Sequence, residues 1–290
     1  MTGLAHNANG NMTTRVEGGS TYTQNFDAEN RLTSVTVGGQ TTTFVYDGDG
    51  NLIKKVNPNG TYTVYVGGLY EVEYSAANVA TKKTSYYPAG AYRLEIVGTS
   101  NNVYYMVGDH LGSASVRLTS SGNIGTGGEQ RYYPFGESRI TNADLKTDHL
   151  FTGQLSVGLG GIYSYGARFY SSKLGRFLSA DTVVPDWKYP QSLNRYSYVY
   201  NNPLKYVDPT GHRTECSGTS DFISESTGDG GISWASCWAI QRDKGLLTSI
   251  GVSDADAETI ATGVDKLGLQ GGFLVFYNQY LRHYDGTKEG

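Results

Sequence analysis

The sequence predicts a mainly β fold over residues 1–211, followed by a small α-rich module over residues 212–290. Three observations predict this division. The first part holds 21 of the 24 tyrosines, and aromatic and β-branched residues suit a pleated, half-buried surface. A repeat of twenty residues opens the chain. Helical spacing of apolar residues appears only in the second part.

The repeat begins at residues 6, 26 and 46, and its copies are His6–Met12, Phe26–Leu32 and Tyr46–Leu52. The second and third copies open on an aromatic–Asp pair that leads into a turn, after which an apolar residue starts a new strand. Asn and Gly accept the positive φ of tight hairpin turns, so Thr41–Tyr46 and Thr61–Val66 are predicted strands of one register. A fixed period of this length indicates stacked units that bury their apolar faces together. These residues are therefore expected to form turns and core.

In the tail, Ser253 is a predicted N-cap of a helix with acidic residues in its first turn. The apolar face of this helix would carry Ile260, Ala261, Val264 and Leu267. A second helix is predicted over 273–281. No metal-ligand spacing, P-loop or Gly-x-Ser-x-Gly motif is visible, so the sequence predicts no cofactor or metal. Cys237 and His283 allow a Cys/His pair, but a core cysteine and a surface histidine are the simpler interpretation.

The net charge of −4 is unevenly divided, because residues 212–290 carry 6 Lys/Arg and 11 Asp/Glu whereas residues 1–211 carry 17 and 16. A nucleic-acid binder usually shows a basic stripe, and neither part shows one. Met1–Asn7 lacks the basic and apolar regions of a Sec signal peptide. The longest apolar run, Phe273–Tyr277, is too short for a membrane span, which takes about 20 residues. Two cysteines, Cys216 and Cys237, are too few for a disulfide framework.

After residue 66 the period decays, and a series of short motifs follows. In chain order they are Asp109–Ser113, Tyr133–Glu137, Phe151–Gln154, Gly166–Tyr170 and Gly175–Leu178. Asp109 beside His110 suggests an acid/base pair. A tight turn is favoured instead, because neighbouring residues in a strand point to opposite faces.

This ordered series resembles the RHS repeat-associated core domain of the RHS-repeat (YD-repeat) family, and the twenty-residue unit resembles the YD repeat itself. The resemblance covers residues 6–211. It implies a YD-repeat β-hairpin spiral sheet, part of an RHS shell, with YD repeats over 1–66 and the core over 67–211. Residues 212–290 would be the variable C-terminal module, an effector. The implied function is that of the C-terminal part of an RHS-type polymorphic toxin in interbacterial competition, whose β-shell encapsulates the effector and releases it by autoproteolysis.

Two aspartates near the boundary, Asp181 and Asp208, suggest how the chain would be cut. Two carboxylates held close share a proton, so that one activates water while the other polarises a carbonyl. The resemblance implies an aspartyl autoprotease that cuts after the Asp-Pro-Thr-Gly motif, at Gly211–His212 or one residue further on. Asp186 competes with Asp208 as the second catalytic residue. Arg176 is expected to orient a carboxylate through a bidentate pair.

Two positions depart from the family pattern. His212 stands where an apolar residue such as Leu is common, and Thr182 replaces a frequent Pro after Asp181. A purely structural interpretation also stays open, since Asp208–Gly211 makes a good turn in which Pro fixes φ and Gly takes the positive angle.

Two other functions stay open. The chain would then be a non-catalytic structural or cell-surface interaction module, as in teneurins, or a degenerate orphan fragment. For the toxin, the expected partners are its own C-terminal segment as cargo, an upstream RHS chain, the secretion machinery and an immunity protein. Its expected localisation is secreted or cell-surface by a non-Sec route. Three repeats are too few to close a shell, so an open sheet edge would favour an upstream chain, a partner or self-association.

Overall fold

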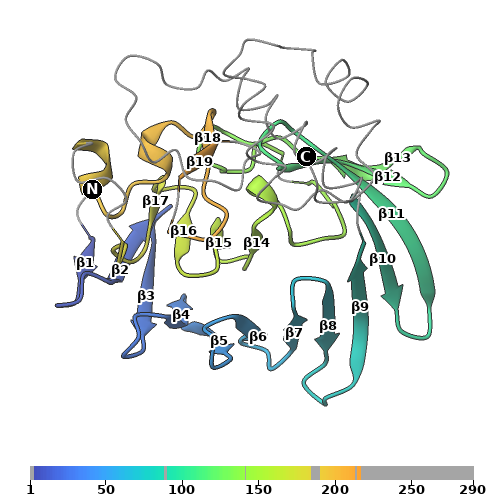
Figure 1. Ribbon diagram of the computed structural model, residues 1–290. Helices are drawn as coiled ribbons and strands as arrows, with labels where there is room; N and C mark the ends of the chain where they lie inside the picture. The colour runs from blue at the N-terminus through green and yellow to red at the C-terminus, as the bar shows by residue number, and fades with distance from the viewer. Residues whose placement is uncertain (1–2, 88–89, 141, 184–189, 213, 217–290) are drawn as a thin grey trace, which may run out of the picture. The chain divides into compact units, whose positions relative to one another are not determined.

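The computed structural model describes residues 3–87, 90–140, 142–183, 190–212 and 214–216 (Figure 1). The chain divides into two units, one of residues 1–204 with 208–214 and the other of residues 205–207 with 215–290. In the second unit the structure describes a two-stranded pairing of β18 (Tyr206–Val207) with β19 (Glu215–Cys216). The predicted helices of the tail, Cys237 and Asp186 lie outside the described residues.

The first unit is built on one sheet of thirteen antiparallel strands that follow one another in chain order. The strands are β1 Ala5–His6, β2 Met12–Glu17, β3 Ser20–Phe26, β4 Leu32–Val37, β5 Gln40–Tyr46, β6 Leu52–Val56, β7 Tyr62–Val66, β8 Tyr70–Tyr74, β9 Ala80–Tyr86, β10 Ala91–Ile96, β11 Ser100–Gly108, β12 Ala114–Thr119 and β13 Ile124–Glu129. The mainly β prediction is confirmed, and the two predicted strands correspond to β5 and β7. The boundary expected at residues 66–67 separates two strands that pair with each other, β7 and β8.

Two kinds of turn recur between these strands. Gly18–Gly19 and Gly38–Gly39 close two-residue hairpins in which all four glycines have positive φ, as the twist of adjacent strands requires. The other kind is a five-residue turn in which the first N–H donates to the fifth carbonyl and the fourth N–H donates to the first carbonyl. Its first and fourth residues are Asn7/Gly10, Asp27/Asn30, Asp47/Gly50, Asn57/Gly60, Ser75/Asn78, Asp109/Gly112 and Thr119/Gly122, and the same turn occurs once more after the sheet, at Tyr133/Gly136.

The leading Asp of the repeat holds this turn in place. Oδ1 of Asp47 accepts the backbone N–H groups of Asp49 at 3.0 Å and of Asn51 at 2.8 Å. Oδ1 of Asp109 accepts those of Leu111 and Ser113 in the same way, which confirms the turn interpretation of Asp109. The turn geometry therefore continues past residue 66 although the residue period does not.

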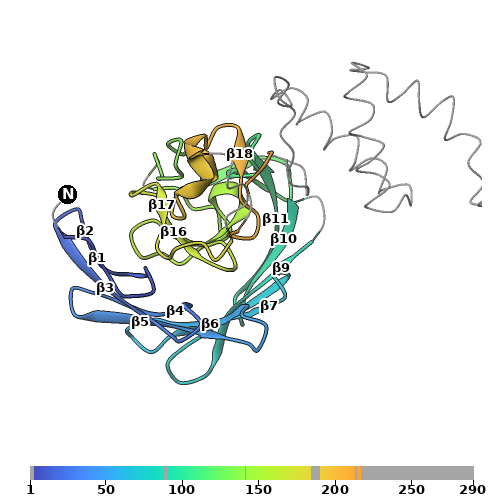
Figure 2. The same ribbon diagram turned by 60° about the vertical axis from the view of Figure 1, so that its left-hand side comes forward.

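The segment that follows the sheet packs on its concave side, as the positions of β16 and β17 in Figure 2 show. It contains three short 3-10 turns and a four-stranded sheet. These elements are η2 Phe151–Gly153, β14 Leu155–Ser156, β15 Ile162–Ser164, β16 Phe169–Ser171, β17 Arg176–Phe177, η3 Pro190–Leu193 and η4 Val199–Asn201. Met12, Leu32 and Phe44 of the large sheet pack against Ile162 and Phe169 in a common core. This core holds the inner segment in place.

A buried ionic network also joins the two layers. Arg15 pairs with Glu17 and donates to Gln24 at 2.7 Å, and its guanidinium lies 3.9 Å from the ring centroid of Tyr22. Ser171 of the inner segment donates to Glu17 at 2.9 Å. The charge of Arg15 is therefore compensated by groups held on strands.

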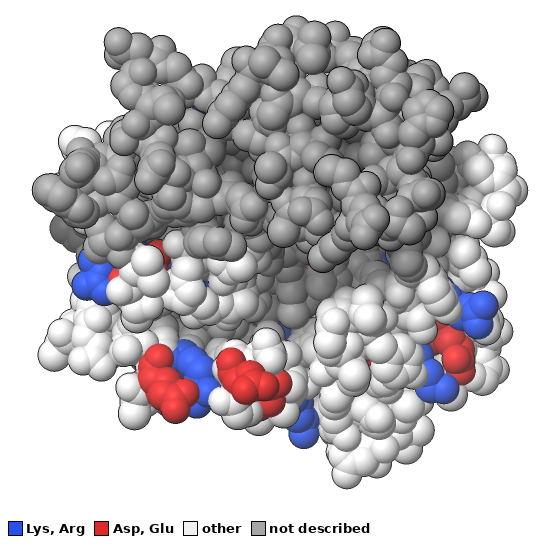
Figure 3. Space-filling model, viewed as in Figure 1, with Lys and Arg blue, Asp and Glu red and all other residues white. Residues whose placement is uncertain are grey.

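On the face shown in Figure 3, acidic and basic side chains of the described residues lie beside one another rather than in a patch of one sign. Among the described residues, no helix is long and apolar enough to cross a membrane.

Candidate functional site

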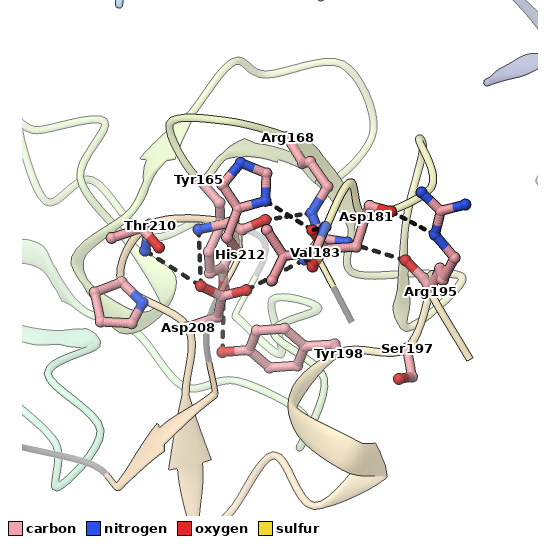
Figure 4. A network of polar contacts seen from close by, with 12 residues as sticks. Tyr165, Arg168, Asp181, Val183, Arg195, Ser197, Tyr198, Asp208, Thr210 and His212 are labelled. Atoms are coloured by element: carbon pink, nitrogen blue, oxygen red, sulfur yellow. Dashed lines mark hydrogen bonds and ion pairs between the residues drawn. The ribbon is translucent and has the colours of Figure 1, made fainter. Parts of the chain in front are cut away.

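Asp181 and Asp208, 27 residues apart in the chain, lie on either side of one guanidinium (Figure 4). Nη2 of Arg168 lies 2.8 Å from Oδ2 of Asp181 and 3.5 Å from Oδ2 of Asp208. All three side chains are buried. The structure thus brings together the two predicted aspartates, and it places between them an arginine that the sequence analysis did not assign to the site.

Arg168 also holds the backbone at the predicted cut. Its Nε donates to the carbonyl oxygen of Gly211, and its Nη1 donates to the carbonyl oxygen of Arg195 at 3.0 Å. The guanidinium carbon lies 3.7 Å from the ring centroid of Phe177. Burial lowers the pKa of Arg168, and the charges of Asp181 and Asp208 oppose that shift. One cation therefore contacts both carboxylates and the carbonyl that precedes His212.

Asp208 fixes the conformation of the Asp-Pro-Thr-Gly turn. Its Oδ1 accepts the backbone N–H of Gly211 at 2.7 Å and that of Thr210 at 3.2 Å. Gly211 has φ +81°, and a Cβ there would lie 2.7 Å from the carbonyl oxygen of Tyr165. Only glycine allows this approach, which brings the carbonyl of residue 211 within reach of Arg168.

Asp181 is held at both carboxylate oxygens. Its Oδ1 accepts the backbone N–H of Val183 at 3.0 Å and lies 2.7 Å from Nδ1 of His212, while Oδ2 faces Arg168. Its backbone is tied to Arg195, whose carbonyl accepts the Asp181 N–H at 2.9 Å. Arg195 Nε in turn donates to the Asp181 carbonyl. The carboxylate is therefore oriented before any reaction begins.

Two spaces adjoin these groups. A cavity of about 20 Å³ is lined by Asp181, Asp208, Arg168 and His212, among others, and a volume of this size accommodates one water molecule. A wider pocket of about 530 Å³ reaches from Arg168 and His212 to the repeat turns at Arg31 and Asn51. The carboxylates are thus buried, but they are accessible to water.

A chain of hydrogen-bonded hydroxyls lies next to Asp208. Tyr165 donates to Tyr198 at 3.3 Å, and Thr152 Oγ1 lies 3.0 Å from the Tyr165 hydroxyl. Burial raises the pKa of Tyr165 and of Tyr198, so both phenols stay neutral at ordinary pH. Figure 4 shows Tyr198 directly beside Asp208.

Of the other two predicted site residues, only Arg176 is among the described residues. Arg176 is exposed on β17, whose next residue, Phe177, is buried. Successive residues of a strand point to opposite faces, so Arg176 points away from the site, and the place expected for it belongs to Arg168. Asp186 lies outside the described residues. The motif Gly166–Tyr170 contains Arg168 and is the sequence signal that could have identified it. In the described part of the chain, no group of three or more His, Cys, Asp or Glu side chains is placed to hold a metal ion.

The chain is similar in sequence and in fold to known proteins. A family model described as "RHS Repeat" matches residues 26–62. The tRNA3(Ser)-specific nuclease WapA of Bacillus spizizenii is 33% identical over 218 residues, which cover 72% of this chain and 9% of the relative. Toxin subunit YenC2 of Yersinia entomophaga is 30% identical over 119 residues, covering 37% of this chain and 12% of that protein.

A crystal structure of the TcdB2-TccC3 complex is similar in fold, with a TM-score of 0.57 and 25% identity. The match covers 71% of this chain and 11% of that chain. The chain thus spans only a small part of the relatives and structures that it matches.

Proposed function

Because the chain is an RHS-repeat protein related to toxin subunits, we propose that it hydrolyses its own peptide bond between Gly211 and His212. The cut would release the chain from residue 212 onward from a shell built by residues 1–211. The contact of Arg168 with both carboxylates and with the Gly211 carbonyl supports this proposal most directly. Hydrolysis of one's own chain needs no substrate binding, since the reacting groups are already close.

The chemistry follows from these positions. A water molecule attacks the carbonyl carbon of Gly211 while Asp181 accepts its proton. Negative charge develops on the Gly211 oxygen, where the guanidinium of Arg168 stabilises it. The C–N bond then breaks, and the proton passes to the departing amine of His212. The products are the carboxylate of Gly211 and a new N-terminus at His212.

In this scheme Asp208 positions the peptide. Its carboxylate holds the N–H of Gly211 and thereby fixes the angle at which water meets the carbonyl. Asp181 and Asp208 differ from a dyad in which two carboxylates share one proton, because Arg168 supplies a permanent positive charge to both. Arg168 polarises the carbonyl, a role that the sequence analysis gave to an aspartate.

The intact mass of the full chain under denaturing conditions tests the proposal, beside Asp181→Asn, which removes the base, and Asp208→Ala, which removes the acceptor for the Gly211 N–H. We expect the wild type to yield two fragments that meet at Gly211–His212 and both variants to stay whole. Asp109→Asn is the control, since the Asp109 carboxylate also accepts two backbone N–H groups of its own turn but is not part of the site, and it should leave cleavage intact. Cleavage that persists in Asp181→Asn would remove the proposed base.

A structural role is the second candidate. It is favoured because every carboxylate oxygen of Asp181 and Asp208 has a hydrogen-bond or ion-pair donor nearby, so the network also stabilises the turn. Intact wild type in a folded sample would move this candidate ahead. We also propose that residues 212–290 are an effector that is delivered by a non-Sec route and bound by an immunity protein. The proposed domain boundaries follow residues 66 and 211. The nuclease activity named for WapA belongs to a protein of which this chain matches 9%.

A further inference from the structure

The residue after the proposed cut contacts the proposed base. Nδ1 of His212 lies 2.7 Å from Oδ1 of Asp181, and the backbone N–H of Val183 already binds that oxygen at 3.0 Å. A carboxylate oxygen has two lone pairs, so these two donors saturate Oδ1. Arg168 faces the other oxygen. Asp181 therefore has little remaining capacity to accept a proton from water while His212 stays in place.

His212 is also open to changes in solvent pH. Its side chain is 34% exposed, against 8% for Asp181, and it lines the pocket of about 530 Å³. Histidine is the ordinary side chain whose charge changes between about pH 5 and 8. The charged or titratable groups that line the two spaces around His212 are Glu29, Arg31 and Asp49 from the repeat turns and Arg168, Asp181, Arg195, Tyr200 and Asp208 from the inner segment.

We propose that His212 is a pH-dependent brake on self-cleavage, a residue of the substrate that restrains the catalytic base. This inference rests on the proposed function. When His212 is protonated, its ion pair with Asp181 is charge-assisted and about twice as strong as a neutral hydrogen bond. The carboxylate is then a poorer base. When His212 loses its proton the pair weakens, and Asp181 becomes free to accept a proton from water.

With a charged imidazolium of His212 against Asp181, the brake is on and cleavage is slow; with a neutral imidazole there, cleavage accelerates. Each 1.36 kcal/mol of barrier changes a rate tenfold, so the loss of one charge-assisted bond should change the rate by about tenfold. Leucine has the volume to fill the same place without a donor, so His212→Leu should release the brake at every pH.

The test measures the rate of self-cleavage of the full chain after refolding from urea, at a series of values from about pH 5.5 to 8, by intact mass. We compare wild type with His212→Leu and with His212→Gln, which keeps a neutral donor. His110→Leu serves as the control, since His110 is exposed on a turn of the sheet. Wild type and the control should speed up about tenfold with rising pH. His212→Leu should cleave at the fast rate throughout, and His212→Gln should lose the pH dependence.

The outcomes separate the two proposals. Cleavage of wild type and His212→Leu with the same pH profile would overturn the brake and leave self-cleavage standing. Slower cleavage in His212→Leu than in wild type, with native circular dichroism, would also overturn it, because His212 would then assist the reaction. Folded chains that stay whole in both proteins at every pH would overturn the proposed function and the brake together.

Discussion

Two buried arginines, Arg15 and Arg168, are built alike and differ in what surrounds them. Each forms an ion pair with a carboxylate, and each guanidinium lies over an aromatic ring. The guanidinium carbon is 3.9 Å from the ring centroid of Tyr22 in Arg15 and 3.7 Å from that of Phe177 in Arg168. Arg15 is fully buried among groups held on strands and the inner segment. Arg168 holds a peptide carbonyl beside a water-sized space. Burial of a charge therefore does not itself indicate catalysis; a reactive bond and access for water are needed as well.

Replacing each arginine by methionine should give the largest difference in cleavage between the two sites. Removing one partner of a buried ion pair costs about 3–5 kcal/mol, so Arg15→Met and Arg168→Met should lower the free energy of unfolding by similar amounts. Only Arg168→Met should abolish cleavage in the fraction that remains folded. Urea unfolding followed by circular dichroism, together with intact mass, measures both quantities. Equal loss of cleavage in the two folded variants would mean that Arg168 acts only by holding the fold.

Gly211→Ala should have the next largest effect. The added Cβ would meet the carbonyl oxygen of Tyr165 at 2.7 Å, and a strained positive φ costs about 1–3 kcal/mol. We expect the turn to shift and cleavage to be lost while the large sheet persists in circular dichroism. Gly38→Ala is the matched control, because Gly38 also has positive φ but nothing lies within 4 Å of its Cβ position. Normal cleavage in Gly211→Ala would show that the carbonyl does not need this placement.

A third pair, buried Glu71 with half-buried His149, differs from the two arginine pairs because its cation can lose a proton. Burial favours neutral His149, but the hydrogen bond and charge of Glu71 outweigh burial and raise the pKa of His149. A raised pKa stabilises the fold fully below the unfolded value of about 6.5, and this stability is lost as pH rises through the folded pKa. We expect a loss of about 1 kcal/mol. Thermal melting across this range should show it in wild type and not in Glu71→Gln.

The smallest effect is expected at the repeat turns. Hydrogen bonds from the side chain and backbone of Asn51 lower the pKa of Asp47, so its contribution is present above the unfolded pKa and is lost as pH falls through the folded value. Asp47→Asn keeps the acceptor and removes the charge. Its melting temperature should lie slightly below that of wild type at neutral pH, and the difference should shrink as pH falls through the folded pKa of Asp47. A difference that persists in acid would assign the effect to shape rather than charge.

The repeat and the site differ in how much of each the sequence predicts. The hairpins could be predicted because Asp27, Asp47 and Gly50 act on neighbours two to four residues away, so pattern and geometry coincide. The period was lost after residue 66 because Ser75 and Tyr133 occupy the same turn position with different chemistry. A turn needs one residue that accepts positive φ, and Asn78 or Gly136 supplies it.

The site was predicted in part, for a physical reason. Asp181 and Asp208 were identified from their motifs. Arg176 is the arginine expected to orient a carboxylate through a bidentate pair, but strand alternation turns it to solvent. Arg168 reaches both carboxylates from the bend that precedes β16, through a tertiary arrangement that no local spacing encodes. The contact of His212 with Asp181 likewise depends on the turn that Gly211 allows.

If water enters the bond between Gly211 and His212, refolding the full chain in water enriched in oxygen-18 labels the new carboxylate. Mass spectrometry of the products should show an N-terminal fragment that ends at Gly211 with one heavy oxygen in its new carboxylate, and a second fragment that begins at His212 without label. A folded chain that remains whole, or fragments that end elsewhere, would contradict the account.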